Sequence, residues 1–160
     1  SRIQINLLND GGYVYHIDSG FEGTEYKGPF LIYGSARSNI TFEAVQLIKT
    51  ILEDYGENFN ANDLEVTQSN LIKSNARAFE TLNAKLNMLD QICNYNYPND
   101  YVKKQELETK NITISDIKKL SDKYLNANQM IYLVVGDAET QLQKLEQLGF
   151  GKPVLLNPKK

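Results

Sequence analysis

Alternation of apolar and polar residues predicts two neighbouring strands near the start of the chain. The first is expected from Tyr13 to Gly20 and the second from Phe30 to Ala36. The segment between them, Glu22 to Pro29, is rich in glycine and charge and contains a proline, so it is expected to be a loop that joins antiparallel strands. Just before the first strand, Gly11 and Gly12 provide the positive φ angles that a helix end needs to reverse direction.

Apolar residues at three- and four-residue spacing predict a set of helices over the middle and the end of the chain. They are expected at residues 41–55, at residues 60–92 with a bend, at residues 113–125 and at residues 140–148. The expected N-terminal caps of these helices are Thr41, Asn60 or Asn62, Thr113 and Asp137. Gly56 follows the last turn of the first of these helices, and Pro98 prevents the second from continuing.

Two further strands are expected near the C-terminus. Met130 to Val135 is a continuous apolar run that ends at Gly136, which is typical of a central strand buried on both faces. Pro153 to Leu156 is expected to add a short edge strand. Strands at both ends with helices between them predict an α+β fold, with an antiparallel or mixed sheet backed by helices.

Composition narrows the class of protein. The 160 residues fit a single domain, 1–160, with a net charge of −3 and no basic stripe, so nucleic acid is not an expected partner. The longest apolar run, Met130 to Val135, is too short to span a bilayer. Cys93 is the only cysteine; it cannot form an internal disulfide and is expected to be a buried small apolar residue.

The candidates for chemistry are few. A hydrolytic zinc needs three protein ligands, and this chain has one histidine, His16, so neither H-E-x-x-H nor H-x-x-E-H is present and no metal ligands are assigned. Alternation places Tyr13, Tyr15 and Ile17 on one face of the first strand. A neutral phenol, with a pKa of about 10, is a hydrogen-bond donor at neutral pH, so Tyr15 is a candidate for oxyanion stabilisation or for packing alone.

Several stretches resemble zinc peptidases of the pitrilysin (insulinase, M16) family. Ser1-Arg2-Ile3, then Asn6-Leu7 and Gly12-Tyr13-Val14-Tyr15, is similar to the family segment S-R-L-x-x-N-L-R-E-x-x-G-Y-x-Y. Further matches follow in family order: Gly28-Pro29-Phe30, Arg77 to Thr81, Tyr97 to Tyr101, Ile114 to Leu125 and Val134 to Asp137. The resemblance covers nearly the whole chain and is to the C-terminal, non-zinc half of such an enzyme.

The resemblance implies that this chain and the zinc site belong to different parts of the enzyme. It implies that the chain is a fragment that starts inside a helix of a C-terminal M16-like domain, which leaves both a periplasmic and a cytoplasmic location open. The zinc and its H-x-x-E-H ligands are expected in another domain or subunit. In the family, an arginine and a tyrosine seven residues apart bind the substrate backbone; the tyrosine matches Tyr15, with Gly12 and Tyr13 beside it, whereas the arginine position is Leu8.

Two functions are therefore expected as alternatives. In the first, this half closes the chamber of a zinc metalloendopeptidase and helps to bind extended peptides, although the chain alone is inactive. In the second, it is an inactive peptidase-like scaffold that assembles with an active homologue. Leu8 leaves three possibilities: Tyr15 acts alone, another cation replaces the arginine, or the copy is degenerate. A nucleotide-binding module is a third alternative and rests only on Gly136 and Asp137.

Overall fold

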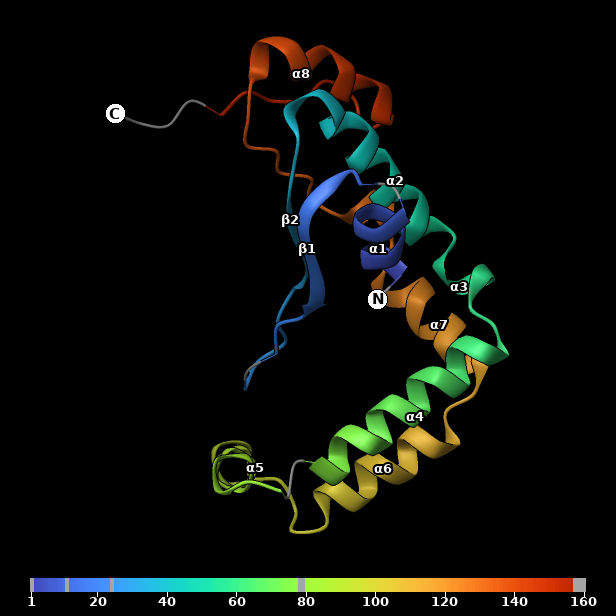
Figure 1. Cartoon of the computed structure of the whole chain (residues 1–160), viewed down its shortest axis with the longest axis vertical. Helices are drawn as coiled ribbons and strands as arrows, with labels where there is room; N and C mark the ends of the chain where they lie inside the picture. The colour runs from blue at the N-terminus through green and yellow to red at the C-terminus, as the bar shows by residue number, and fades with distance from the viewer. Residues whose placement is uncertain (1, 11, 24, 78–79, 157–160) are drawn as a thin grey trace. The chain divides into compact units, whose positions relative to one another are not determined.

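The computed structural model of the chain describes residues 2–10, 12–23, 25–77 and 80–156 (Figure 1). The chain divides into two compact units. Unit 1 consists of Ser1–Tyr55 and Lys123–Lys160, and unit 2 consists of Gly56–Asp122. The single domain expected for residues 1–160 stays a prediction.

Unit 1 is built around an antiparallel hairpin. Strand β1 (Val14–Phe21) pairs with strand β2 (Phe30–Ala36), in a register that places Ile17 opposite Gly34. The backbone N–H of Glu22 donates to the carbonyl of Pro29 at 2.9 Å and so closes the loop between the strands. The predicted hairpin is confirmed, with the bounds of its first strand shifted by one residue.

Helices cover one face of this hairpin, and the core lies between them. A short helix α1 (Arg2–Gln4), a π-helical segment η1 (Ile5–Asp10) and helix α2 (Thr41–Glu53) contribute buried side chains to it. The buried members of this core are Ile3, Leu7, Val14, Ile17 and Ala44. The expected arrangement of a sheet backed by helices is therefore confirmed for these two strands.

The ends of α2 differ from the prediction. The Thr41 hydroxyl does not cap the helix; it donates to the carbonyl oxygens of Arg37 and Ser38, at 3.3 and 3.2 Å. A 3₁₀ turn, η2 (Ser38–Ile40), precedes the helix; Ser38 is its first residue, and Arg37 lies directly before it. The helix ends at Glu53, and Gly56 lies inside the short helix α3 (Tyr55–Asn58) instead of following the last turn.

The central strand expected at Met130 to Val135 is absent, so this prediction was wrong. Ile131, Leu133 and Val135 are 96, 72 and 93% exposed. The alternate residue Tyr132 faces inward: its ring stacks on Phe150 with centroids 4.6 Å apart, and its hydroxyl donates to the carbonyl of Ala127 at 3.0 Å. Alternation is present, but a strand also needs a backbone partner, and residues 131–136 form no backbone hydrogen bond to another described residue.

The remainder of unit 1 contains short helices. They are a 3₁₀ turn η3 (Ala127–Gln129), helix α8 (Ala138–Leu145) and a 3₁₀ turn η4 (Glu146–Leu148). Lys49 of α2 connects to this region, because its ammonium donates to the carbonyl of Leu148 at 2.9 Å and lies 4.7 Å from the centre of the Phe150 ring. The predicted edge strand at 153–156 does not form either.

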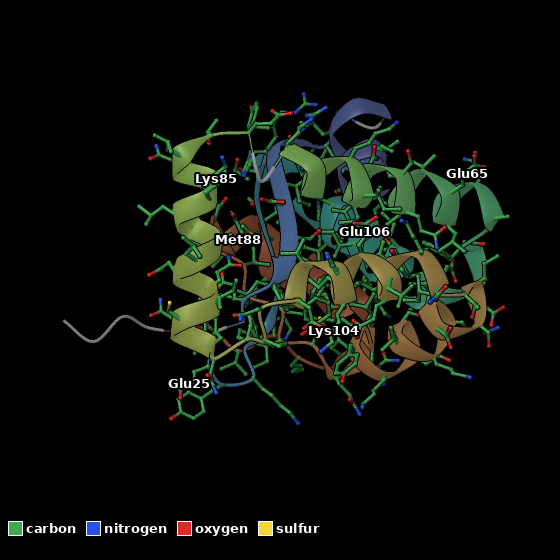
Figure 2. All side chains as sticks on the ribbon, turned by 90° about the horizontal axis from the view of Figure 1, so that it is seen from below. Glu25, Glu65, Lys85, Met88, Lys104 and Glu106 are labelled. Carbon is green, nitrogen blue, oxygen red and sulfur yellow. The ribbon has the colours of Figure 1, made fainter. Side chains whose placement is uncertain are left out.

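Unit 2 is helical. Its longer helices are α4 (Ala61–Arg77), α5 (Leu82–Tyr95), α6 (Tyr101–Asn111) and most of α7 (Ile114–Tyr124). Figure 2 labels Glu65 on α4, Lys85 and Met88 on α5, and Lys104 and Glu106 on α6. Helices α4 and α6 pack side by side, and the Gln68 amide donates to the carbonyl of Thr109 at 2.8 Å.

The long helical run expected at residues 60–92 is two helices. Helix α5 has its own cap, since the Thr81 hydroxyl accepts from the N–H of Ala84 at 3.1 Å. The helix ends at Tyr95, close to the predicted stop at Pro98, and its C-terminal cap Asn96 has a left-handed φ of 52°. Cys93 lies on α5 and is exposed, which corrects its predicted burial. No helix among the described residues is both long and apolar enough to cross a membrane.

Candidate functional site

Tyr15 occupies an irregular position in β1. Val14 pairs with Ala36 and His16 pairs with Ser35, so Tyr15 is one extra residue on this strand. Such a β-bulge redirects side chains. Val14 and Ile17 are both buried, whereas the Tyr15 side chain is 70% exposed. The prediction that Tyr15 and Ile17 share a face was therefore wrong, because the bulge interrupts the alternation between them.

Gly12 and Tyr13 form the approach to this strand. Gly12 has a φ of +55°, the positive value expected at the reversal, while Gly11 lies outside the described residues. The N–H of Tyr13 donates to the carbonyl of Leu7 at 2.9 Å, and the Tyr13 side chain packs against the core. Of the three predicted substrate-binding residues, Tyr15 presents the most side-chain surface. The binding roles of Gly12, Tyr13 and Tyr15 stay predictions.

A cation lies at the same end of the hairpin. Arg37 directly follows the end of β2, and one of its terminal nitrogens (Nη2) donates to the carbonyl of Gly12 at 2.7 Å. Sequence reasoning did not single out Arg37, because 25 residues separate it from Gly12 and only the register of the hairpin brings them together. Leu8, at the position of the family arginine, is 38% exposed.

The two edges of the sheet differ in how their backbone groups are used. On β1 the carbonyl of Ile17 accepts a hydrogen bond from the Gln4 amide at 3.3 Å, so α1 occupies part of that edge. Strand β2 forms no backbone hydrogen bond to any described residue outside the hairpin. An unpaired strand edge can accept a further extended chain, so β2 is the more open edge.

The surroundings of His16 do not fit a metal. His16 is exposed, and its ring centroid lies 6.1 Å from that of Tyr33. Within the described part of the chain, no three side chains of His, Cys, Asp or Glu gather in a way that would hold a metal ion. The residues of this hairpin do not match the ligand set of a hydrolytic zinc, and no metal-dependent step is assigned to them.

The turn at Gly136 and Asp137 is a helix cap. The Asp137 carboxylate accepts from the N–H of Glu139 at 3.1 Å and from the Thr140 hydroxyl at 2.7 Å. This carboxylate therefore occupies the N-terminus of α8, where a nucleotide phosphate would otherwise bind. The arrangement favours the predicted cap over the nucleotide-binding alternative.

A group of tyrosines in unit 2 surrounds Pro98. The ring centroids of Tyr97 and Tyr101 lie 4.2 Å apart in a stacked arrangement, and those of Tyr95 and Tyr97 lie 5.5 Å apart. Burial, together with the neighbouring Tyr97 phenol, raises the pKa of Tyr101. These contacts indicate a structural role for the three rings.

A solved structure resembles this chain in fold. No protein-family profile and no curated protein matches its sequence. The crystal structure of the peptidase M16 inactive domain from Pseudomonas fluorescens matches with a TM-score of 0.69 and 22% sequence identity. The match covers 79% of this chain and 30% of the other one. The chain therefore has the α+β fold of an M16 inactive domain, as the sequence resemblance implied.

Proposed function

We propose that this chain is a non-catalytic part of an M16-type zinc metalloendopeptidase, which closes a chamber around a zinc site held by another domain or subunit. The likeness of its fold to an M16 inactive domain supports this function. The observation that carries the proposal is the β-bulge, which turns Tyr15 outward at the end of the hairpin. When bound in the other domain, the zinc would supply the activated water.

The substrate would be an extended peptide. Its main chain would pair with the open edge of β2, which gives affinity with little dependence on peptide sequence. The Tyr15 phenol would donate a hydrogen bond to a peptide carbonyl or to the oxyanion that develops from it. Unfolded segments would therefore be the preferred substrates.

Arg37 would replace the missing family arginine. A guanidinium has five N–H donors, and the bond to Gly12 uses one of its nitrogens. The remaining donors lie at the end of the hairpin that carries Tyr15, where a peptide carbonyl can be bound with the assistance of charge. Of the three possibilities that Leu8 leaves open, the presence of Arg37 favours a substitute cation.

The test is peptide cleavage by the complete enzyme carrying Tyr15→Phe. Loss of one oxyanion donor is expected to lower kcat by about a hundred- to a thousandfold, with little change in KM. The matched control is Tyr26→Phe, which removes an exposed phenol from the hairpin loop and should leave the rate unchanged. A parental rate in the Tyr15→Phe enzyme would remove the catalytic role.

The second candidate function is an inactive scaffold, and Leu8 is the observation that favours it. The two candidates differ in their response to Leu8→Arg. In an active assembly the new guanidinium adds a charged donor seven residues before Tyr15. Leu8→Arg alone should therefore increase cleavage, and Leu8→Arg combined with Arg37→Ala should maintain the parental rate. If no assembly that contains the chain cleaves peptides, although the chain binds them, the scaffold is the correct function.

A further inference from the structure

Helix α5 carries a row of apolar side chains that the rest of unit 2 does not cover. Leu82, Leu86 and Leu89 are 84, 64 and 55% exposed, and Cys93 continues the row and is exposed. Different apolar residues of the helix, Ala84, Met88 and Ile92, are partly buried (Met88 is labelled in Figure 2). Helix α5 therefore has one apolar face that is partly buried and a second one that is exposed.

The spacing within the open row is that of a two-helix seam. Successive members are four, three and four residues apart, which matches positions d, a, d and a of a heptad. Leucine at both d positions favours a two-stranded parallel pair. This row is called the α5 seam below and consists of Leu82, Leu86, Leu89 and Cys93.

The charges beside the α5 seam select the partner. In the heptad that the seam defines, Lys85 is at position g and Asp90 is at position e. In a parallel pair, g of one helix lies beside e of the other, five residues further along, so Lys85 of each copy would meet Asp90 of the second copy. In an antiparallel pair, g lies beside g, so Lys85 of one copy would lie beside Lys85 of the other. The Asn94 amide donates to Oδ2 of Asp90 at 3.0 Å, which leaves Oδ1 for the lysine.

We propose that α5 is a self-association surface, and that it pairs in parallel with α5 of a second copy of this chain. Its 14 residues make a helix about 21 Å long, which is two heptads. A contact of this length gives a weak dimer that depends on concentration. The proposal does not depend on the proposed peptidase function.

Cys93 provides a direct test, because the seam places it opposite itself in a parallel pair only. The 160-residue chain is incubated with oxidised glutathione, which accepts the two electrons and two protons released when two Cys93 thiols form a disulfide. The matched control is Cys93→Ser combined with Asn87→Cys, which moves the thiol to an exposed position away from the seam. Disulfide dimer should form at least tenfold faster in the parent chain. Equal rates in the two proteins would overturn the proposal.

Charge reversal tests the orientation. Lys85→Glu and Asp90→Lys should each slow formation of the homodimer severalfold, because each places like charges together. A mixture of these two variants should form the mixed dimer preferentially, and the double variant should regain the parental rate. Identical rates for all of these proteins would contradict a parallel pair. Circular dichroism of each variant verifies that α5 is still folded, and Leu86→Asp should abolish dimer formation without loss of helix.

Discussion

At the scale of single residues, Gly34 marks a close approach between the strands of the hairpin. A Cβ atom at Gly34 would lie 2.4 Å from the carbonyl oxygen of His16 and 3.1 Å from the Cα of Ile17. Gly34→Ala must therefore push the strands apart, and we expect the free energy of unfolding to fall by about 1–3 kcal/mol. Urea denaturation monitored by circular dichroism measures this change.

The control for that substitution is Gly20→Ala in β1. A Cβ added there meets no atom within 4 Å, so the free energy of unfolding should stay within about 0.5 kcal/mol of the parent value. Equal losses of stability in the two variants would show that β-propensity, and not the contact with His16, determines the cost.

The cap of α7 should make stability depend on acidic pH. The Thr113 hydroxyl and N–H both donate to the Asp116 carboxylate, at 2.6 and 3.0 Å, and these bonds hold the pKa of Asp116 below its usual value. A lowered pKa stabilises the folded state above the pKa of the unfolded chain, near 3.8, and this contribution is lost as pH falls through the lower folded value.

The corresponding experiment compares the parent chain with Asp116→Asn by thermal unfolding between pH 7 and pH 2.5. The variant should have a lower Tm at pH 7 and should lose less stability on acidification. If the two proteins lost the same amount of stability between these pH values, the cap would not contribute to the acid sensitivity.

The residue roles that could be predicted are those that depend only on neighbours in the sequence. The caps at Asn60, Thr113 and Asp137 form as expected, because each needs only a side-chain oxygen and an N–H two or three residues away. Tyr15 was predicted as a candidate residue but was placed on the wrong face, since a pattern of apolar and polar residues does not encode a bulge. Arg37 reaches Gly12 only through the register of β1 and β2.

At the scale of elements, the segment from Met130 to Val135 has the alternating exposure of a strand but no backbone pairing with any described strand. Ile131→Thr should change the free energy of unfolding by less than about 0.5 kcal/mol, because this side chain is 96% exposed. Tyr132→Ala removes the ring stacked on Phe150 and the bond to Ala127, so we expect a loss of roughly 2 kcal/mol. Chemical denaturation of both variants distinguishes the two faces; equal effects would contradict the alternation.

The elements that could be predicted are those whose sequence signal lies within one continuous segment, such as a single helix or a hairpin. Helices α2, α4 and α7 have apolar rows, and Asn60 and Thr113 cap α4 and α7; strands β1 and β2 are joined by one loop. The strand at Met130 could not be assessed from its own residues, because pairing depends on a neighbour. Helix α6 was not predicted, since its sequence has too few apolar side chains to form a regular row.

At the scale of the whole molecule, the proposed function requires a second component. The described residues contain no cluster suited to a metal, and the likeness extends over 30% of the solved M16 chain. We therefore expect the purified 160-residue chain to cleave no peptide, with or without added zinc, when fluorogenic peptides are assayed over several hours. Cleavage that a chelator abolishes would contradict the assignment of the zinc site to another component.

The extra residue in β1 has a consequence for how this hairpin can change over time. With Tyr15 left out of the count, Val14, His16, Ile17 and Asp18 alternate regularly between buried and exposed. The alternation of β1 therefore does not need Tyr15. A deletion of Tyr15 would leave every core side chain of the strand on its present face. Descendants of such a protein can lose or regain this side chain independently of the architecture that displays it.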